Sequence, residues 1–390
     1  MKIAIIGKGT VGCVTALTSA HASLGEVDWY FDPDKKPQAV GEGSTLTLPR
    51  TLHETLNFSV KDFSKIDATV KTGIYKEDWG TTSKPFLHDF PSPQVAMHFN
   101  ATKLQDYIED ALKDSVNIIK KNITSSDIDA DYILDCSGRP TSYEDFDESP
   151  YIPVNSVFVT QCYWPFPAFN HTLAIARPYG WVFGIPLQNR CSVGYMYNKD
   201  INTLEEVKED VKYIFERFNL TPSKDTNAFS FNNYRRKENF VDNVCYNGNA
   251  SFFLEPLEAT TFGSALNINS VAQGHYNKRF TKEQSESRYQ AIMDAGEAII
   301  MLHYSAGSSF KSDFWSYAKE RGSKYMEQAD DSVLYMLKHS KKPKRLGSYA
   351  SSFVQPNGQT MHFEALYSAW WEGSFSQNVE GLGLSGVYQC

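Results

Sequence analysis

The sequence of 390 residues is short of cysteine and has no excess of positive charge, and both shortages exclude classes of protein. Its six cysteines are scattered and form no C-x-x-C pair, so neither a zinc knuckle nor a disulfide framework is indicated, and a reducing cytoplasm is the expected location. The 46 acidic side chains outnumber the 38 basic ones, which gives a formal net charge of −8. Because nucleic-acid binding needs a basic surface, no nucleic-acid partner is expected.

Long apolar runs, internal repeats and low-complexity tracts are also missing from the sequence. No apolar run reaches membrane-spanning length, so no membrane partner is expected. The histidines show no metal-binding spacing, and no metal site is predicted. We interpret residues 1–6 as a core strand rather than a signal peptide, because a glycine turn follows where a cleavage site would stand. The chain is long enough for a large core and two or three subdomains.

The first distinctive pattern is KIAIIGKGTVG at residues 2–12. An apolar run typical of a buried strand leads into a glycine turn and then into an apolar run that is compatible with a helix. This is the fingerprint of a dinucleotide-binding turn, whose open amides face phosphates at the start of the helix. Its three glycines permit the tight turn, the close approach of a pyrophosphate and the packing of helix on strand. The predicted cofactor residues here are Gly7, Gly9, Thr10, Val11 and Gly12.

A second predicted strand, 27–31, ends at Asp32. The spacing from the glycine turn is about that at which an acidic side chain receives a ribose hydroxyl. Strand, turn, helix, strand and acid together predict a dinucleotide-binding α/β domain. The alternative interpretation is a glycine turn in an ordinary α/β domain.

The rest of the chain alternates between helical and strand patterns, with a β-rich middle. Residues 68–76 are predicted as a strand with Val70, Thr72 and Ile74 on one face and Lys71 on the other. The prolines between residues 80 and 98 predict an irregular loop. Further elements are expected as a loop at 33–50, helices at 102–116, 203–218 and 282–337, strands near 132–135 and 244–246, and β structure over 154–197.

Four units follow from this order. We predict a first dinucleotide-binding segment over 1–150, a β-rich subdomain over 151–240, a return to the first domain over 241–310, and a helical C-terminal region over 311–390.

A second distinctive stretch is FFLEPLEATTF at residues 252–262. Pro256 interrupts regular structure, and a helix can start near Ala259. The amides of Thr260 and Thr261 would then be open donors at the positive end of that helix, which suits a small anion. Glu258 stands beside this position, and the alternative is that it only favours the helix start from solvent.

Several motifs in the same order resemble those of the flavin-dependent halogenases, and of their tryptophan-halogenase branch in particular. They are a flavin fingerprint, a strap motif (usually G-E-A-T), the segment with an active-site lysine, W-x-W-x-I-P, F-L-E-P-L-E-S-T-[GS] and a later block. The corresponding segments here are 7–12, 41–44, 68–74 with Trp79, 181–186 continued by 187–197, 253–261, and 302–304 with 313–315.

The resemblance implies a fold and a set of cofactors. The fold would be α/β, with a Rossmann-like FAD-binding domain of the PHBH-like flavin monooxygenase type, an inserted β-sheet substrate subdomain and a helical C-terminal part. The enzyme would be an oxidoreductase that uses FAD as FADH2, with O2 and a chloride, bromide or iodide ion. Besides the glycine turn, the implied FAD-binding residues are Asp32, Gly41, Glu42 and Asn249.

The resemblance also implies roles for residues near the chemistry. Hypohalous acid made at the flavin would travel through a tunnel to Lys71, which holds or captures the halogen, and to Glu258, which orients that species or removes a proton from the substrate. Thr260 and Thr261 would bind the halide. Together, Lys71 and Glu258 would deliver electrophilic halogen to an indole- or phenol-like ring.

Further residues are implied on the substrate side and along the tunnel. His88 and Phe90 resemble the family's H-x-F substrate sandwich, and Trp370 is predicted as a third wall, with core packing as its alternative. In the W-x-W-x-I-P signature the tunnel residues are Trp181, Phe183 and Pro186.

Three departures from the family pattern stand out. Phe183 replaces the second tryptophan of the signature, Ala259 replaces a serine, and Thr261 stands where glycine or serine is common. The chain is also shorter than typical tryptophan halogenases, mainly in regions that build the tryptophan pocket. Tryptophan itself is therefore not assigned as the substrate.

The expected partners are a small aromatic substrate and a separate NAD(P)H-dependent flavin reductase, because the sequence holds one nucleotide fingerprint and no second one. The sequence leaves a homo-oligomer open. Two alternatives to a halogenase also stay open. One is a flavin monooxygenase that hydroxylates an aromatic substrate, and the other is a degenerate flavin-binding protein.

Overall fold

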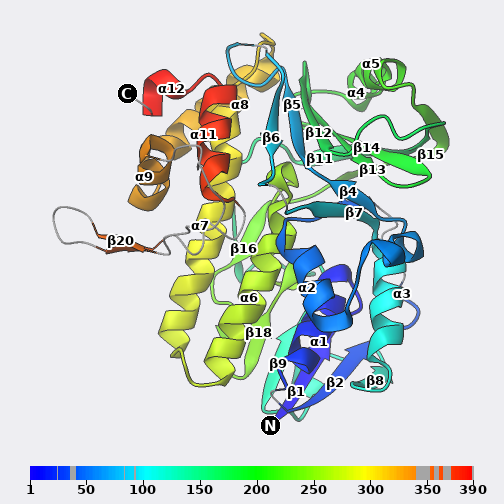
Figure 1. Ribbon diagram of the computed structural model, residues 1–390. Helices are drawn as coiled ribbons and strands as arrows, with labels where there is room; N and C mark the ends of the chain where they lie inside the picture. The colour runs from blue at the N-terminus through cyan, green and yellow to red at the C-terminus, as the bar shows by residue number, and fades with distance from the viewer. Residues whose placement is uncertain are drawn as a thin grey trace.

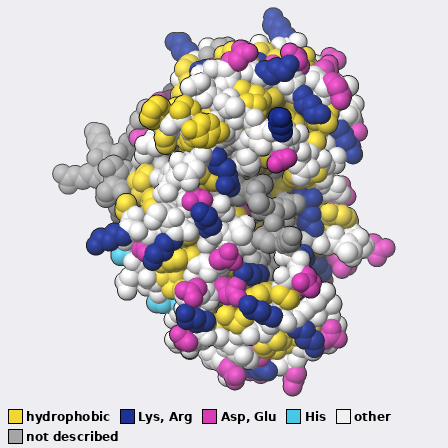
Figure 2. Space-filling view, turned by 90° about the vertical axis from the view of Figure 1, so that its right-hand side faces the viewer, with side chains coloured by type: hydrophobic (Ala, Val, Ile, Leu, Met, Phe, Trp, Pro, Cys, Tyr) yellow, Lys and Arg dark blue, Asp and Glu magenta, His cyan; other side chains and the backbone are white. Residues whose placement is uncertain are grey.

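The computed structural model describes residues 1–23, 25–35, 41–82, 84–91, 94–339, 352–354, 360–362 and 370–388. Figure 1 shows a lower region around the N-terminal strand, an upper region of long antiparallel strands, and a group of helices that runs along one side of both. Within the described residues, no helix is long and apolar enough to cross a bilayer. On the face shown in Figure 2, basic and acidic side chains are interspersed.

The lower region is built on a six-stranded sheet in the order β17-β18-β9-β1-β2-β8. Strand β1 is buried and pairs in parallel with both β2 and β9, as apolar runs of this kind do in doubly covered sheets. The predicted strand, helix and strand at the N-terminus are confirmed. The bounds are β1 Lys2–Ile6, α1 Thr10–His21, β2 Glu26–Phe31, β8 Asn117–Lys120, β9 Tyr132–Asp135, β17 Phe240–Val241 and β18 Val244–Tyr246.

The upper region is a seven-stranded sheet in the order β15-β11-β14-β13-β12-β5-β6. It confirms the β-rich middle of the chain, but β5 and β6 come from the first 100 residues, and β5 pairs in parallel with β12. The predicted boundary at residue 150 therefore does not follow the sheets. The bounds are β5 Gly73–Glu77, β6 Phe86–Asp89, β11 Ser156–Tyr163, β12 Thr172–Arg177, β13 Gly180–Pro186, β14 Arg190–Tyr197 and β15 Thr221–Ser230.

Two small sheets join the regions. Strands β3 (Gly41–Gly43), β7 (Ala96–Asn100) and β4 (Thr69–Lys71) form one, and β10 (Phe146–Glu148), β16 (Tyr234–Arg236) and β19 (Phe252–Phe253) form the other. The prediction of an irregular loop over 80–98 was wrong, because β6 and the start of β7 lie there. Pro85 and Pro91 flank β6 instead of interrupting it, so neither removes a hydrogen bond from within the strand.

The predicted strand over 68–76 is two strands. Strand β4 pairs with β7, whereas β5 pairs with β6 and β12, so the chain passes from one sheet to the other at Thr72. The Thr72 amide donates to the Asn170 carbonyl at 3.0 Å, in register with the pairing of β5 with β12. A side chain at Gly73 would stand 2.4 Å from the His88 carbonyl oxygen, so only glycine allows β6 to come this close. Both Lys71, at the end of β4, and Lys76, in β5, are buried.

Helices cover one side of both regions (Figure 1). The expected helices are found with two differences: the helix over 203–218 breaks at Val211, and the helix over 282–337 is three helices. The C-terminal region holds a short hairpin as well as helices. The bounds are α2 Thr47–Leu56, α3 Ala101–Leu112, α4 Leu204–Asp210, α5 Lys212–Arg217, α6 Thr260–Tyr276, α7 Lys282–Ala306, α8 Asp313–Glu327, α9 Asp331–His339, β20 Ser352–Val354, β21 Thr360–His362, α11 Glu372–Gly381 and α12 Ser385–Tyr388.

Candidate active site

A cavity of about 430 Å³ connects the glycine turn of the lower region with the inner face of the seven-stranded sheet. At one end it is lined by the start of α1, and at the other by Lys71 and Glu258. Its walls between these ends include Trp181 and Phe183 of β13. Residues predicted to serve the cofactor, the halide and the transfer of halogen therefore line one connected space.

In the glycine turn, a side chain would be excluded or tolerated for a different steric reason at each of the three glycines. Gly7 has a φ of +106°, and a side chain there would stand 2.3 Å from the Cys136 carbonyl oxygen. A side chain at Gly12 would stand 2.3 Å from the Gly7 carbonyl oxygen, so this glycine lets α1 pack on β1. At Gly9 an added Cβ meets no protein atom within 4 Å. The space in front of Gly9 and the first amides of α1 is thus available to a phosphate group.

Other predicted cofactor residues lie around this turn. Glu42 and Asn249 line the cavity with Thr10 and Val11. The Thr10 hydroxyl donates to Glu42 at 3.1 Å, and burial raises the pKa of the Glu42 carboxyl to about 7 against that hydrogen bond. Gly41 pairs with Asn100 in the small sheet beside them.

Asp32 follows β2 directly, at the same sheet edge as the glycine turn, since the Gly7 amide donates to the Tyr30 carbonyl at 2.8 Å. Its carboxylate accepts the amide of Asp34 at 2.9 Å. Asp32 does not belong to the described lining of the cavity, and its assignment to a ribose stays a prediction.

At the upper end of the cavity, Lys71 is 1% exposed. Its ammonium donates to the Ser44 carbonyl oxygen at 3.0 Å and lies 5.5 Å from the centre of the Phe90 ring. Burial lowers the pKa of Lys71 to about 8, assisted by Lys76 and opposed by Glu258. An amine with this pKa exists in both protonation states near neutral pH, which suits a group that exchanges protons.

Glu258 is enclosed by hydrogen-bond donors. Lys76 contacts its Oε1, while its Oε2 lies 2.9 Å from His88 Nδ1 and accepts from Trp370 Nε1 at 2.7 Å. Burial opposes ionisation, but Lys76 and His88 outweigh it and hold the pKa of Glu258 well below its usual value. The site therefore holds a fixed negative charge at its upper end.

The backbone at Glu258 is strained. Glu258 and Ala259 have φ values of 69° and 53°, in the left-handed region that non-glycine residues seldom adopt. Helix α6 then begins at Thr260, as predicted, and Thr261 lines the cavity. Since the first amides of a helix have no partner within it, the amides of Thr260 and Thr261 are donors at the positive end of α6.

Two of the three predicted substrate residues lie against Glu258. His88 and Trp370 are buried, Trp370 Nε1 donates to Glu258, and His88 Nδ1 lies 2.9 Å from it. Ser374 lies 2.6 Å from His88 Nε2. The rings of His88 and Phe90 meet edge to face at 5.6 Å with an interplanar angle of 89°. They therefore do not form parallel walls, and their role toward a substrate stays a prediction.

Two of the three signature residues, Trp181 and Phe183, line the cavity, whereas Pro186 does not belong to its described lining. Trp181 and Phe183 lie 6.2 Å apart between ring centres, and Trp181 Nε1 donates to Glu255 at 2.9 Å. Pro186 ends β13, and its carbonyl accepts from Thr69 at 2.7 Å. These contacts hold the signature strand against the segment that carries Lys71.

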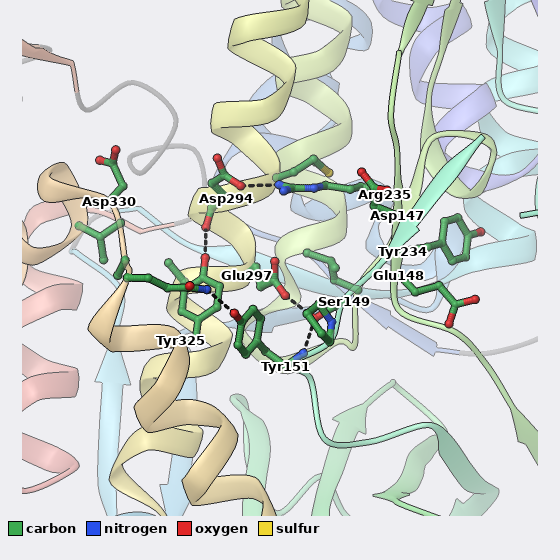
Figure 3. A pocket seen from close by; sticks show the side chains of 17 residues that line it. Asp147, Glu148, Ser149, Tyr151, Tyr234, Arg235, Asp294, Glu297, Tyr325 and Asp330 are labelled. Atoms are coloured by element: carbon green, nitrogen blue, oxygen red, sulfur yellow. Dashed lines mark hydrogen bonds and ion pairs between the residues drawn. The ribbon is translucent and has the colours of Figure 1, made fainter. Parts of the chain in front are cut away.

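A second cavity, of about 640 Å³, lies between the β10–β16 sheet and the helices (Figure 3). Carboxylates and tyrosines line it, and the Arg235 guanidinium contacts Asp294 there. None of the predicted site residues belongs to its described lining. Across the described parts of the chain, no group of three or more histidine, cysteine or acidic side chains is placed to hold a metal ion.

Lys76, His303 and Asn378 surround Glu258 or its partners but were not among the predicted site residues. A signal for Lys76 was present, because alternation places it on the same face of its strand as the apolar Ile74. His303 lies in a motif block but had no assigned role, and no sequence pattern connects Asn378 with residues some 300 positions away.

A family model described as "Tryptophan halogenase" matches residues 2–111 and 94–342. Tryptophan 7-halogenase RebH of Lentzea aerocolonigenes is 26% identical over 252 residues, which cover 60% of this chain and 46% of that protein. 7-Chloro-L-tryptophan 6-halogenase KtzR of Kutzneria sp. (strain 744) is 22% identical over 301 residues, which cover 70% of this chain and 57% of that protein. The chain thus spans about half the length of these curated relatives.

The fold agrees with solved structures. BrvH, a flavin-dependent halogenase from Brevundimonas sp. BAL3, superimposes with a TM-score of 0.77 at 18% identity, over 100% of this chain and 91% of that chain. A likeness at this identity shows a shared fold, and it confirms the predicted Rossmann-like α/β architecture. Because the family model also matches most of the sequence, the chain belongs to the tryptophan halogenase family of flavin-dependent halogenases.

Proposed function

We propose that the protein is an FADH2- and O2-dependent halogenase that transfers electrophilic halogen to an electron-rich aromatic ring of the indole or phenol type. The observation that carries this proposal is the single cavity lined by the start of α1, by Thr261 at the start of α6, and by Lys71 and Glu258. Membership of the family supports the same reaction class.

The residues at the lower end suit FAD. Open space at Gly9, the first amides of α1, and the nearby Glu42 and Asn249 can hold the pyrophosphate and its neighbouring groups. When bound, reduced FAD with O2 supplies the oxidising equivalents that turn halide into hypohalous acid. The amides of Thr260 and Thr261 would hold the halide, since a helix N-terminus attracts a small anion.

Lys71 and Glu258 would act on hypohalous acid at the upper end. The Lys71 ammonium donates a hydrogen bond to the oxygen of hypohalous acid and so polarises its bond to halogen. The aromatic carbon bonds to the halogen, that halogen–oxygen bond breaks, and the hydroxyl leaves as water with a proton from Lys71. The ring then loses its own proton to the neutral amine of Lys71, which restores the ammonium. Glu258, with its low pKa, is a weak base, so we assign it the stabilisation of positive charge on the ring.

The partners are proposed from the same geometry and from the sequence. We propose a small aromatic substrate and a separate NAD(P)H-dependent flavin reductase that delivers FADH2 by diffusion. NADH oxidation by the purified protein alone, at the rate of product formation, would contradict the second proposal.

Product mass tests the reaction. The protein is incubated with FAD, NADH, a flavin reductase and O2 on a panel of indoles and phenols, with chloride, bromide, iodide or no halide. We expect a product that has gained one halogen in place of one hydrogen, and only when halide is present. A product heavier by one oxygen without halide would instead indicate hydroxylation, and no product with any halide across the panel would overturn the proposal.

We expect Gly9→Ala to weaken FAD binding without loss of stability. The added methyl group meets no protein atom within 4 Å, but it occupies the space proposed for the pyrophosphate. The Kd for FAD should rise roughly tenfold or more, which corresponds to about 1.4 kcal/mol. Titration with FAD followed by fluorescence, together with thermal unfolding, measures both effects.

Gly386→Ala is the matched control, because an added Cβ there also meets no atom within 4 Å and the residue lies in α12. It should leave the Kd unchanged. Equal Kd values for the Gly9 variant, the Gly386 variant and the parent protein would place the pyrophosphate elsewhere.

A further inference from the structure

Two lysines, five positions apart, are buried near Glu258. Lys71 ends β4 and Lys76 lies in β5. Both are almost completely enclosed, with exposures of 1% and 0%. A buried lysine is costly unless its charge is compensated or used, so each of the two needs a physical account.

The contacts of Lys76 match an ammonium group. Its three N–H donors meet three acceptors, namely Glu258 Oε1, Asn378 Oδ1 and His303 Nε2, the last at 2.6 Å. His303 Nδ1 lies 2.7 Å from the Ile299 carbonyl oxygen, which can only accept. The ring proton of a neutral His303 therefore sits on Nδ1, and its Nε2 accepts from Lys76.

The contacts of Lys71 differ. Its ammonium donates to one neutral acceptor, the Ser44 carbonyl, and the residue lines the cavity. Lys76 does not belong to the described lining of that cavity. Glu258 thus interacts with two lysines, of which Lys76 contacts it directly and Lys71 faces the cavity.

We propose that Lys76 is a positioning residue, which holds the Glu258 carboxylate and thereby leaves Lys71 as the amine that faces the cavity. This inference rests on the proposed function only in its statement that Lys71 is the amine used in halogen transfer. The charge arrangement itself belongs to the protein without flavin or halide.

The arrangement has a consequence for the proton equilibrium of Lys71. The charged and titratable groups coupled to it are Glu258 before α6, Lys76 on β5, His88 on β6 and His98 on β7. Burial lowers the pKa of Lys71 most, Glu258 raises it and Lys76 lowers it. Without Lys76, the negative charge of Glu258 would act on Lys71 uncompensated, and the Lys71 ammonium would be retained to higher pH.

Competitive acetylation tests this directly. Trace acetic anhydride transfers an acetyl group to a neutral amine and releases acetate and a proton, so the rate follows the unprotonated fraction. Peptide mass spectrometry of the full-length protein, without flavin or halide, gives the rate for Lys71 as a function of pH. The exposed Lys208 of α4 is the internal reference in each digest.

For the parent protein, we expect Lys71 acetylation to be half-maximal near pH 8. In Lys76→Met the midpoint should rise by about one pH unit, which makes acetylation at pH 7 roughly tenfold slower. In Glu258→Gln it should fall. An unchanged midpoint in Lys76→Met, or faster acetylation of Lys76 than of Lys71 in the parent protein, would overturn the proposal.

A double variant covers the case in which Lys76→Met does not fold. Lys76→Met with Glu258→Gln replaces the buried ion pair by two neutral side chains of similar size, which is often tolerated. Its midpoint should lie above that of Glu258→Gln alone, because the positive charge of Lys76 is gone. Equal midpoints would contradict a role for Lys76.

The test is separable from the proposed function. If the midpoint of Lys71 acetylation does not respond to Lys76→Met, the positioning role of Lys76 is contradicted but a halide-dependent product can still form. If no halogenated product forms, the proposed function is contradicted but the acetylation midpoints still test the role of Lys76.

Discussion

Replacing Lys71 by methionine should abolish halogenated product while the protein stays folded and at least as stable as before. The variant keeps the length of the side chain but removes the donor that is proposed to polarise hypohalous acid. We expect a loss of at least about 10²-fold in product formed per FADH2 supplied, the lower end for a positioned acid–base group. Because the substitution keeps the length of the side chain and leaves the glycine turn untouched, the Kd for FAD should not change.

Stability should move in the opposite direction from activity. The pKa of Lys71 is lowered from 10.5 to about 8, so at pH 7 the buried ammonium disfavours the folded state by about 3 kcal/mol relative to the unfolded chain. Loss of the hydrogen bond to Ser44 offsets part of the gain, by about 1 kcal/mol. Urea unfolding at pH 7 should therefore show an equal or higher free energy of unfolding for Lys71→Met.

The pH dependence gives a second measurement. Between the folded pKa of about 8 and the unfolded value of 10.5, the unfolded chain binds more protons at Lys71 than the folded protein does. The free energy of unfolding should therefore gain a rising contribution across this window in the parent protein, and this contribution should be absent from the variant. Lys208→Met, on the surface of α4, should keep both the activity and the rise. Full activity of Lys71→Met would remove Lys71 from the mechanism.

The sequence could predict those parts of the site that are determined by residues close together in the chain. The turn from β1 into α1 was predictable because one short segment contains the strand, all three glycines and the helix start. The start of α6 at Thr260 was predictable for the same reason, since Pro256 and the following residues set it locally.

The surroundings of Glu258 were not predictable, because they come from four distant parts of the chain. Lys76 lies on β5, His88 on β6, His303 on α7, and Trp370 just before α11. No local period relates these positions, and only the packing of the C-terminal region against the seven-stranded sheet brings them together.

That both Lys71 and Lys76 are buried could not be derived from one alternating strand. Alternation over 68–76 places Lys71 on the face opposite Val70 and Ile74, but the segment changes sheets at Thr72. The Thr72 amide donates to the Asn170 carbonyl, in register with the pairing of β5 with β12. Lys71 thus belongs to the three-stranded sheet and Lys76 to the seven-stranded sheet, and both side chains are buried.

Replacing Glu258 by glutamine should lower both activity and stability. Three donors converge on this carboxylate, from Lys76, His88 and Trp370. The glutamine NH2 group must point either at Lys76 or at the other two, so one donor always faces another. Removing one partner of a buried ion pair costs about 3–5 kcal/mol. We expect a loss of this order in urea unfolding at pH 7, together with a loss of about 10²-fold in product formation.

The stability difference between the parent protein and Glu258→Gln should depend on pH. Because the pKa of Glu258 is held well below its usual value in the folded protein, the carboxylate contributes stability above its unfolded pKa of about 4.3, and this contribution is lost as pH falls through the folded pKa. The difference in free energy of unfolding between parent protein and Glu258→Gln should therefore be largest at neutral pH and shrink below about pH 4.

Glu216→Gln, at an exposed position in α5, is the matched control and should show neither effect. A constant difference between parent and Glu258→Gln from pH 7 to pH 3 would mean that the loss comes from packing and not from charge. Glu258 would then not supply the fixed negative charge that is proposed to stabilise positive charge on the aromatic ring. Another group would have to provide that stabilisation.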